Sequence, residues 1–170
     1  LDQSGGLDRD PGALLSAPFI VKHIGEDDIL RLHILFLGGG PEIRSKTYRV
    51  YHRHKISVLV DEIISWATEG VTLLGCTPGV LAVGIGRTHF EATALMLEAM
   101  VYGDLGVQSD LEKHITKRLN KSNVGALGLG GDTTILGTFL KIGPQRASGV
   151  RIISVRPCCY LEPRIASVYL

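Results

Sequence analysis

The segment VLAVGIGRTHFEATALMLEAM, residues 80–100, contains a strand-to-helix pattern that decides the fold. VLAVGIG, residues 80–86, is a short apolar run and predicts a buried strand. Thr88 and Glu91 follow at the three-residue spacing of a capping box, which predicts that a helix begins after Thr88. Apolar residues recur at helical spacing up to Gly103, where we expect this helix to end. A buried strand followed by an amphipathic helix predicts a sheet covered by helices.

The flanking segments repeat these patterns. ISVLVDEIISWATEG, residues 56–70, carries an apolar helical stripe, and Gly70 predicts its end. Ser109 and Glu112 predict a third helix start. Strands are expected at residues 18–24, 29–36 and 150–156, with the first two paired antiparallel and half exposed. We therefore predict an α+β fold, one domain over residues 1–170, with a mixed, largely antiparallel sheet covered by at least three helices.

Composition limits the classes of function. The chain has 170 residues, a formal net charge of +1 and scattered basic residues, which argues against nucleic acid and anionic membranes as partners. The basic run YRVYHRHK, residues 48–55, is expected to be a solvated segment. The longest apolar run of the chain is interrupted by proline and glycines, so no membrane span is expected. Three cysteines cannot form an even disulfide framework, which favours a cytoplasmic protein.

Three segments that flank predicted strands have the composition of a site. They are LGGGPE, GCTPG and RPCCYLEPR, residues 37–42, 75–79 and 156–164. Ends of strands gathered at one sheet edge commonly form sites. A fourth segment, NVGALGLGGDTTILG, residues 123–137, is rich in glycine. Its glycines allow either a close approach to another group or a tight bend. A phosphate loop is excluded because no lysine follows the glycines.

In their order along the chain, GGGPE, GCTPGVLAVGIGRT, NVGALGLGGDTTILG and PCCYLEPRIAS resemble one enzyme family. It is the alpha subunit, or N-terminal half, of class I iron–sulfur fumarate hydratase and L(+)-tartrate dehydratase. The resemblance runs from about Gly38 to the end of the chain. It implies a hydro-lyase acting on fumarate/malate or tartrate. In that family a [4Fe–4S] cluster is held by three cysteines, and one iron stays open as a Lewis acid.

The resemblance also implies cluster ligands. Cys76 matches one ligand, although the family's Cys-Pro-Pro reads Cys-Thr-Pro here, and the last ligand falls at Cys158 or Cys159. Adjacent residues on an extended segment point to opposite sides, so only one of this pair is expected to reach the cluster. The family's first cysteine lies in an upstream Cys-Gln-Asp-Thr-Gly motif. We therefore expect a partial domain, lacking its N-terminal region, that supplies two of three ligands, so the cluster is expected in the complete enzyme.

For the substrate, the resemblance implies that backbone N–H groups of Gly38, Gly39 and Gly40 hold a carboxylate. Arg164 takes the place of the family's arginine pair. Residues 125–131 would bring main chain close to the cluster pocket or a partner, with Thr133 and Thr134 supplying hydroxyls to the turn. No catalytic residue is assigned, because the acids Glu42, Asp132 and Glu162 have no visible orienting partner in the sequence.

A partner is therefore expected. The resemblance implies a beta subunit or a C-terminal domain of the same enzyme, within a homo- or hetero-oligomer. The other interpretation is a non-catalytic or regulatory homologue that keeps the fold and binds a partner without a cluster.

Overall fold

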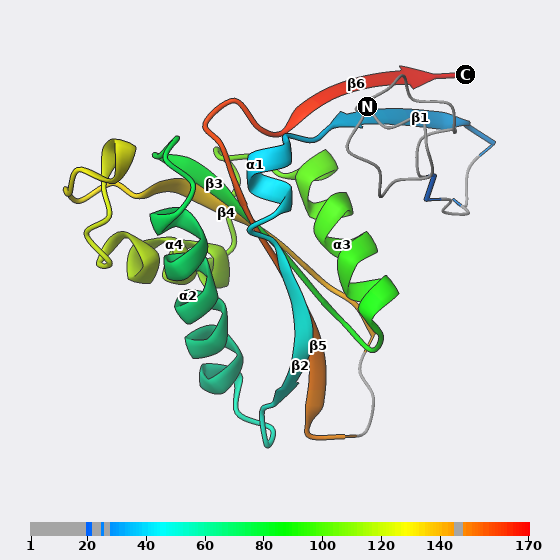
Figure 1. Ribbon diagram of the computed structural model, residues 1–170. Helices are drawn as coiled ribbons and strands as arrows, with labels where there is room; N and C mark the ends of the chain where they lie inside the picture. The colour runs from blue at the N-terminus through cyan, green and yellow to red at the C-terminus, as the bar shows by residue number, and fades with distance from the viewer. Residues whose placement is uncertain (1–19, 22–24, 26–27, 145–147) are drawn as a thin grey trace, which may run out of the picture.

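A computed structural model describes residues 20–21, 25, 28–144 and 148–170. Its main sheet has four strands in the order β2-β5-β3-β4, drawn in Figure 1, with bounds Lys46–Tyr51, Val150–Cys158, Gly79–Gly86 and Ile135–Ile142. β5 is antiparallel to both β2 and β3, whereas β3 and β4 are parallel. The predicted α+β class with a mixed, largely antiparallel sheet is confirmed.

Helices cover both faces of this sheet. Helices α2, Ile56–Thr72, and α4, Asp110–Asn120, lie on one side, and α3, His89–Tyr102, lies on the other (Figure 1). Successive residues of β3 point to opposite faces. Leu81, Val83 and Ile85 join the core cluster under α2 and α4, while Val80 and Ala82 join the cluster under α3. Every residue of β3 is buried, which explains its continuous apolar sequence.

The helix starts follow the predicted caps. The Thr88 side chain accepts a hydrogen bond from the Glu91 backbone N–H, and Ser109 forms a complete capping box with Glu112. The prediction that Gly70 ends a helix is wrong, since α2 continues to Thr72. A Cβ at Gly70 would lie 2.9 Å from Cγ of Pro157, so glycine permits close packing of this helix on β5.

A second sheet consists of β1, Arg31–Phe36, and β6, Arg164–Tyr169, paired antiparallel. The predicted partner of β1, residues 18–24, lies mostly outside the described residues, and Ile20 and Val21 belong to no strand. The apolar side chains of Leu32, Ile34 and Phe36 are about half exposed. The alternation that predicted a strand therefore does not mark a core face here.

Five elements of the described residues lie where no strand or helix was predicted. They are β2, β4, β6, the four-residue helix α1, Gly39–Glu42, and the short 3-10 helix η1, Ala126–Gly128. Part of the basic run 48–55 lies in β2, and His52 after it is 3% exposed, so the expectation of a solvated segment is wrong there. Within the described residues, no helix is long and apolar enough to cross a membrane.

Candidate functional site

The three segments predicted from strand ends meet at one end of the main sheet, beside the start of β3 and the end of β5, and this end of the strands is called the thiol edge below. β3 and β5 are antiparallel, and Val80 pairs with Cys158, so the segment before β3 adjoins the segment after β5. Cys76 precedes β3 and Cys159 follows β5. The third segment joins them through Gly38, whose backbone N–H donates a hydrogen bond to Oε1 of Glu162. Sheet topology thus brings together residues that are far apart in the sequence.

The thiols of Cys76 and Cys159 form the centre of this edge. Their sulfur atoms are 2.6 Å apart, and both residues are partly exposed free cysteines. The Cys76 thiol also contacts the carbonyl oxygen of Leu74 at 3.6 Å. The structure does not bring Cys158 to this pair. Its side chain is 1% exposed and packs in the core cluster under α3.

The ionisation of these cysteines follows their surroundings. Burial raises the pKa of the Cys158 thiol to about 12. Burial also raises the pKa of Cys159, and the neighbouring Cys76 thiol adds to this effect. A bound metal ion reverses such shifts, because its positive charge deprotonates a coordinating thiol. Binding of a metal at this pair would therefore release protons.

The two thiols are donors of the kind that suits soft metals, which include copper(I), zinc and iron–sulfur clusters. Thiolates are the usual protein ligands of iron–sulfur clusters. In a [4Fe–4S] cluster each cysteine thiolate binds a different iron. The Cys76 and Cys159 sulfurs are 2.6 Å apart, which is too close for two such ligands, so they would have to move apart to hold a cluster. Among the described residues, no group of three or more His, Cys, Asp or Glu side chains could hold a metal ion. The pair provides two thiol donors, and no third donor of these types joins them among the described residues.

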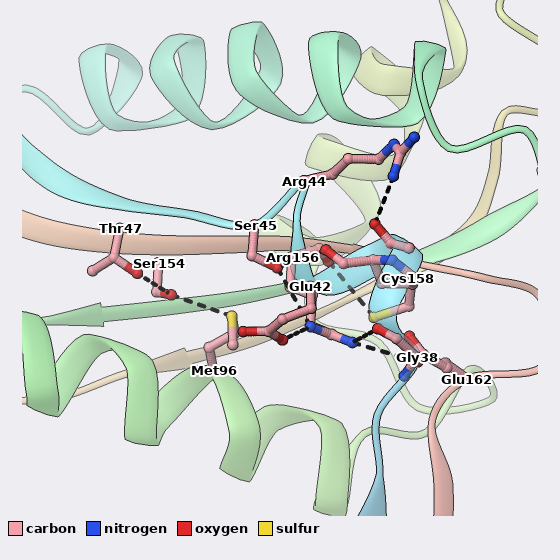
Figure 2. Close-up of polar contacts among 12 residues, drawn as sticks. Gly38, Glu42, Arg44, Ser45, Thr47, Met96, Ser154, Arg156, Cys158 and Glu162 are labelled. Carbon is pink, nitrogen blue, oxygen red and sulfur yellow. Dashed lines mark hydrogen bonds and ion pairs between the residues drawn. The ribbon is translucent and has the colours of Figure 1, made fainter. Parts of the chain in front are cut away.

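A buried charge network holds the turn that follows β5 (Figure 2). The guanidinium of Arg156 is fully buried and contacts both Glu42 and Glu162, the latter at 3.4 Å. Its Nη2 also donates to the carbonyl oxygen of Gly38 at 3.1 Å. The Glu162 backbone N–H donates to the carbonyl oxygen of Cys159 at 2.9 Å. Arg156 thus connects α1, β5 and the turn that carries Cys159.

Two of the acids therefore have an orienting partner that sequence reasoning missed. Glu42 and Glu162 both contact Arg156, which corrects the expectation that neither has one. Glu162 is 5% exposed, and its Oε2 has no hydrogen-bond partner among the described residues. A signal was present in the sequence: Arg156 is a charged residue at the end of the predicted strand VRIISVR, and a charge that is buried in a sheet requires a partner.

The predicted substrate residues lie at the same edge or beside it. Gly38 precedes α1 and its N–H group is already bonded to Glu162. Gly39 and Gly40 are exposed, and no hydrogen bond among the described residues uses their N–H groups. Arg164 is exposed at the start of β6, where it pairs with Phe36.

The glycine-rich loop closes on itself and on the Cys76 segment. Gly125 has a φ of 69°, and a Cβ there would lie 1.9 Å from the carbonyl oxygen of Gly130, so only glycine fits. The Thr77 hydroxyl donates to the Gly125 carbonyl at 2.6 Å, and Leu127 N–H donates to the Thr77 carbonyl at 3.0 Å. The Thr134 hydroxyl accepts from Gly125 N–H at 3.1 Å. The loop is a tight bend that also supports the residue next to Cys76.

Comparison with known proteins gives the family of the chain. A family model described as "Fumarate hydratase (Fumerase)" matches residues 8–168. The chain is 29% identical over 137 residues to a protein of Methanocaldococcus jannaschii named "Putative L(+)-tartrate dehydratase subunit alpha". That alignment covers 75% of this chain and 47% of the relative. The chain therefore spans about half the length of the curated relative it matches.

Proposed function

The chain belongs to the fumarate hydratase (Fumerase) family, and from that membership we propose that it is a subunit or half of a hydro-lyase. The proposed reaction is the reversible hydration of a C4 dicarboxylate, giving malate from fumarate or acting on tartrate. The observation that carries this proposal is the contact between the Cys76 and Cys159 thiols, 2.6 Å apart at the edge where four loops meet.

We propose that Cys76 and Cys159 are two of the three ligands of a [4Fe–4S] cluster. Cys158 is not assigned a ligand role, because its side chain packs under α3. The third ligand comes from a part of the enzyme outside this chain. When bound, such a cluster supplies a Lewis acid that polarises the hydroxyl group leaving the substrate.

We propose that the residues around the thiols orient Cys76 and Cys159 and take no part in the reaction itself. Arg156 and Glu162 hold the turn of Cys159, and Thr77 fixes the segment after Cys76 through the glycine-rich loop. Positioning of this kind matters because displacement of a ligand by about 1 Å can lower a rate by about a hundredfold.

For the substrate carboxylates, we propose the N–H groups of Gly39 and Gly40, with Arg164 as a cationic side chain nearby. The N–H of Gly38 is excluded from this role by its bond to Glu162. Backbone N–H groups that are already oriented can bind an anion without reorganisation.

A partner is proposed for the proton transfer. Removal of water needs a base on the substrate carbon as well as a Lewis acid on the hydroxyl. The carboxylates of Glu42 and Glu162 are both ion-paired with Arg156, and we propose that they position the turn rather than take the proton. The words "subunit alpha" in the name of the relative support a second subunit, and a C-terminal domain of the same enzyme would serve equally. Three free cysteines support a reducing compartment, and we propose the cytoplasm.

Activity of the full-length protein with its partner tests the proposal. We expect anaerobic preparations to consume fumarate or tartrate, and the isolated chain supplied with iron and sulfide to have no measurable activity. Turnover by the isolated chain would show that the base lies within these residues. Absence of turnover and of a cluster in the complete protein would favour the non-catalytic homologue.

A glycine pair tests the carboxylate site separately. A Cβ at Gly39 meets no atom within 4 Å, so Gly39→Ala should raise KM with an unchanged melting temperature. A Cβ at Gly38 would lie 2.8 Å from Oε1 of Glu162, so the matched variant Gly38→Ala should lower the melting temperature as well. Unchanged KM in Gly39→Ala would remove Gly39 from the site.

A further inference from the structure

A cavity of about 480 Å³ lies at the other end of the main sheet from the two thiols. It is bounded by the first turns of α2 and α4 and by the ends of β3 and β4. β5 connects the two places, since Arg151 near its start lines the cavity and Cys158 at its end adjoins the thiol edge. Cavities of this volume hold small organic ligands.

The walls of the cavity are almost entirely aliphatic. They include Leu59 and Ile63 from α2, Ile85 from β3, Ile115 from α4 and Leu140 from β4. Exposed residues at its edge, among them His54 and Ile142, give it an opening to solvent. Such walls favour an apolar body, since the polar side chains of the lining are His52, His54 and Arg151, and the centroids of the two histidine rings are 5.7 Å apart.

One end of the cavity carries a cation and an imidazole. Arg151 is 4% exposed and donates to the carbonyl oxygen of Pro144 at 2.8 Å, and it forms no ion pair with any described residue. Glu91 acts on Arg151 electrostatically, but its carboxylate is bonded to Arg87 at 2.6 Å. A buried guanidinium without a bonded anion is costly, and a ligand anion would relieve that cost.

His52 adds a second polar group to the same end. It is 3% exposed, lines the cavity, and its Nε2 has no hydrogen-bond partner among the described residues. Burial, His54 and Arg151 together lower the pKa of its imidazole, so the ring is neutral at physiological pH and can donate one N–H. A carboxylate could accept from this N–H and from Arg151 together.

We propose that this cavity binds a monocarboxylate with an unbranched apolar chain, its carboxylate on Arg151 and His52 and its chain between α2, α4 and the sheet. A C4 dicarboxylate is excluded, because its second charge would lie among aliphatic side chains. This site is separate from the proposed hydro-lyase site and does not depend on that activity.

Calorimetric titration of the full-length protein with octanoate tests the proposal. We expect octanoate to bind. Succinate, which has a second carboxylate, and octylamine, which has a cationic head group on an apolar chain of the same length, should not compete for the site. Arg151→Gln should weaken octanoate binding about tenfold or more, because a charge-assisted hydrogen bond is lost. Leu59→Phe should weaken binding by filling the cavity. The matched control is Arg118→Gln, an exposed arginine paired with Asp61, which should bind as the wild type does.

Wild-type protein gives a measurement that needs no variant. Octanoate should shift the methyl resonances of Ile115 and Leu140 and leave that of Val80, under α3, unchanged. Absence of binding, equal binding of octylamine, or shifts confined to methyl groups away from the cavity would each overturn the proposal.

Discussion

Replacing Arg156 by methionine removes the cation from the network that holds the turn of Cys159. Methionine keeps an unbranched chain and loses the guanidinium. Glu162, 5% exposed, would then remain buried without its ion pair. Removing one partner of a buried pair costs about 3–5 kcal/mol. The Glu42 side chain is 63% exposed and regains water, so its lost contact adds about 0–1 kcal/mol. The free energy of unfolding should fall by about 4 kcal/mol, out of roughly 5–15 kcal/mol for a domain.

Urea unfolding followed by circular dichroism, on metal-free protein under reducing conditions, measures this loss. Adding Glu162→Gln to Arg156→Met should restore part of the stability, because the buried carboxylate is then neutral. The control is Arg118→Met, whose exposed ion pair with Asp61 is worth about 0–1 kcal/mol. A loss as small as this control, or no recovery in the double variant, would refute the role of Arg156 as the buried counter-charge.

Two further predictions concern pH and packing. Because burial lowers the pKa of His52, the unfolded chain binds its proton first as pH falls below about 6.5, so stability should decrease between pH 7 and pH 5. Melting scans should show a smaller decrease in His52→Gln and an unchanged one in His114→Gln, whose histidine is exposed; equal pH dependence in both variants would contradict this assignment. In Gly84→Ala the new Cβ would lie 2.0 Å from the carbonyl oxygen of Ala92, so stability should fall by about 3 kcal/mol or more. A wild-type melting temperature for that variant would show that α3 is not packed on β3 as described.

Local patterns in the sequence predicted the centre of the fold. The run 80–86 and the cap at Thr88 gave β3 and α3 close to their observed bounds, because burial and capping act on neighbouring residues. Pairing between β1 and β6 could not be predicted from such local patterns, since the paired residues Phe36 and Arg164 are 128 positions apart in the sequence. The predicted end of α2 at Gly70 was wrong because glycine can either end a helix or allow close packing, and here it allows the helix to pack on β5.

The candidate site was predicted in part. The three segments meet as the positions at strand ends suggested, but their meeting depends on β3 and β5 being antiparallel neighbours. The choice between Cys158 and Cys159 also depends on strand register. β5 continues through Cys158, which directs that side chain under α3 and leaves Cys159 beside Cys76. The role of Arg156 was not predicted, because its local sequence does not indicate which carboxylates it contacts.

The most direct test of the proposed function compares serine variants of the three cysteines in anaerobically prepared full-length protein. Iron content and visible absorption report the cluster. We expect Cys76→Ser and Cys159→Ser to lose both, since each removes a proposed ligand from the thiol pair. Cys158→Ser should keep the colour and iron while its melting temperature falls, because that side chain is buried in the core. Colour lost in Cys158→Ser but kept in Cys159→Ser, or a colourless wild-type protein, would contradict the assignment of Cys76 and Cys159 as cluster ligands.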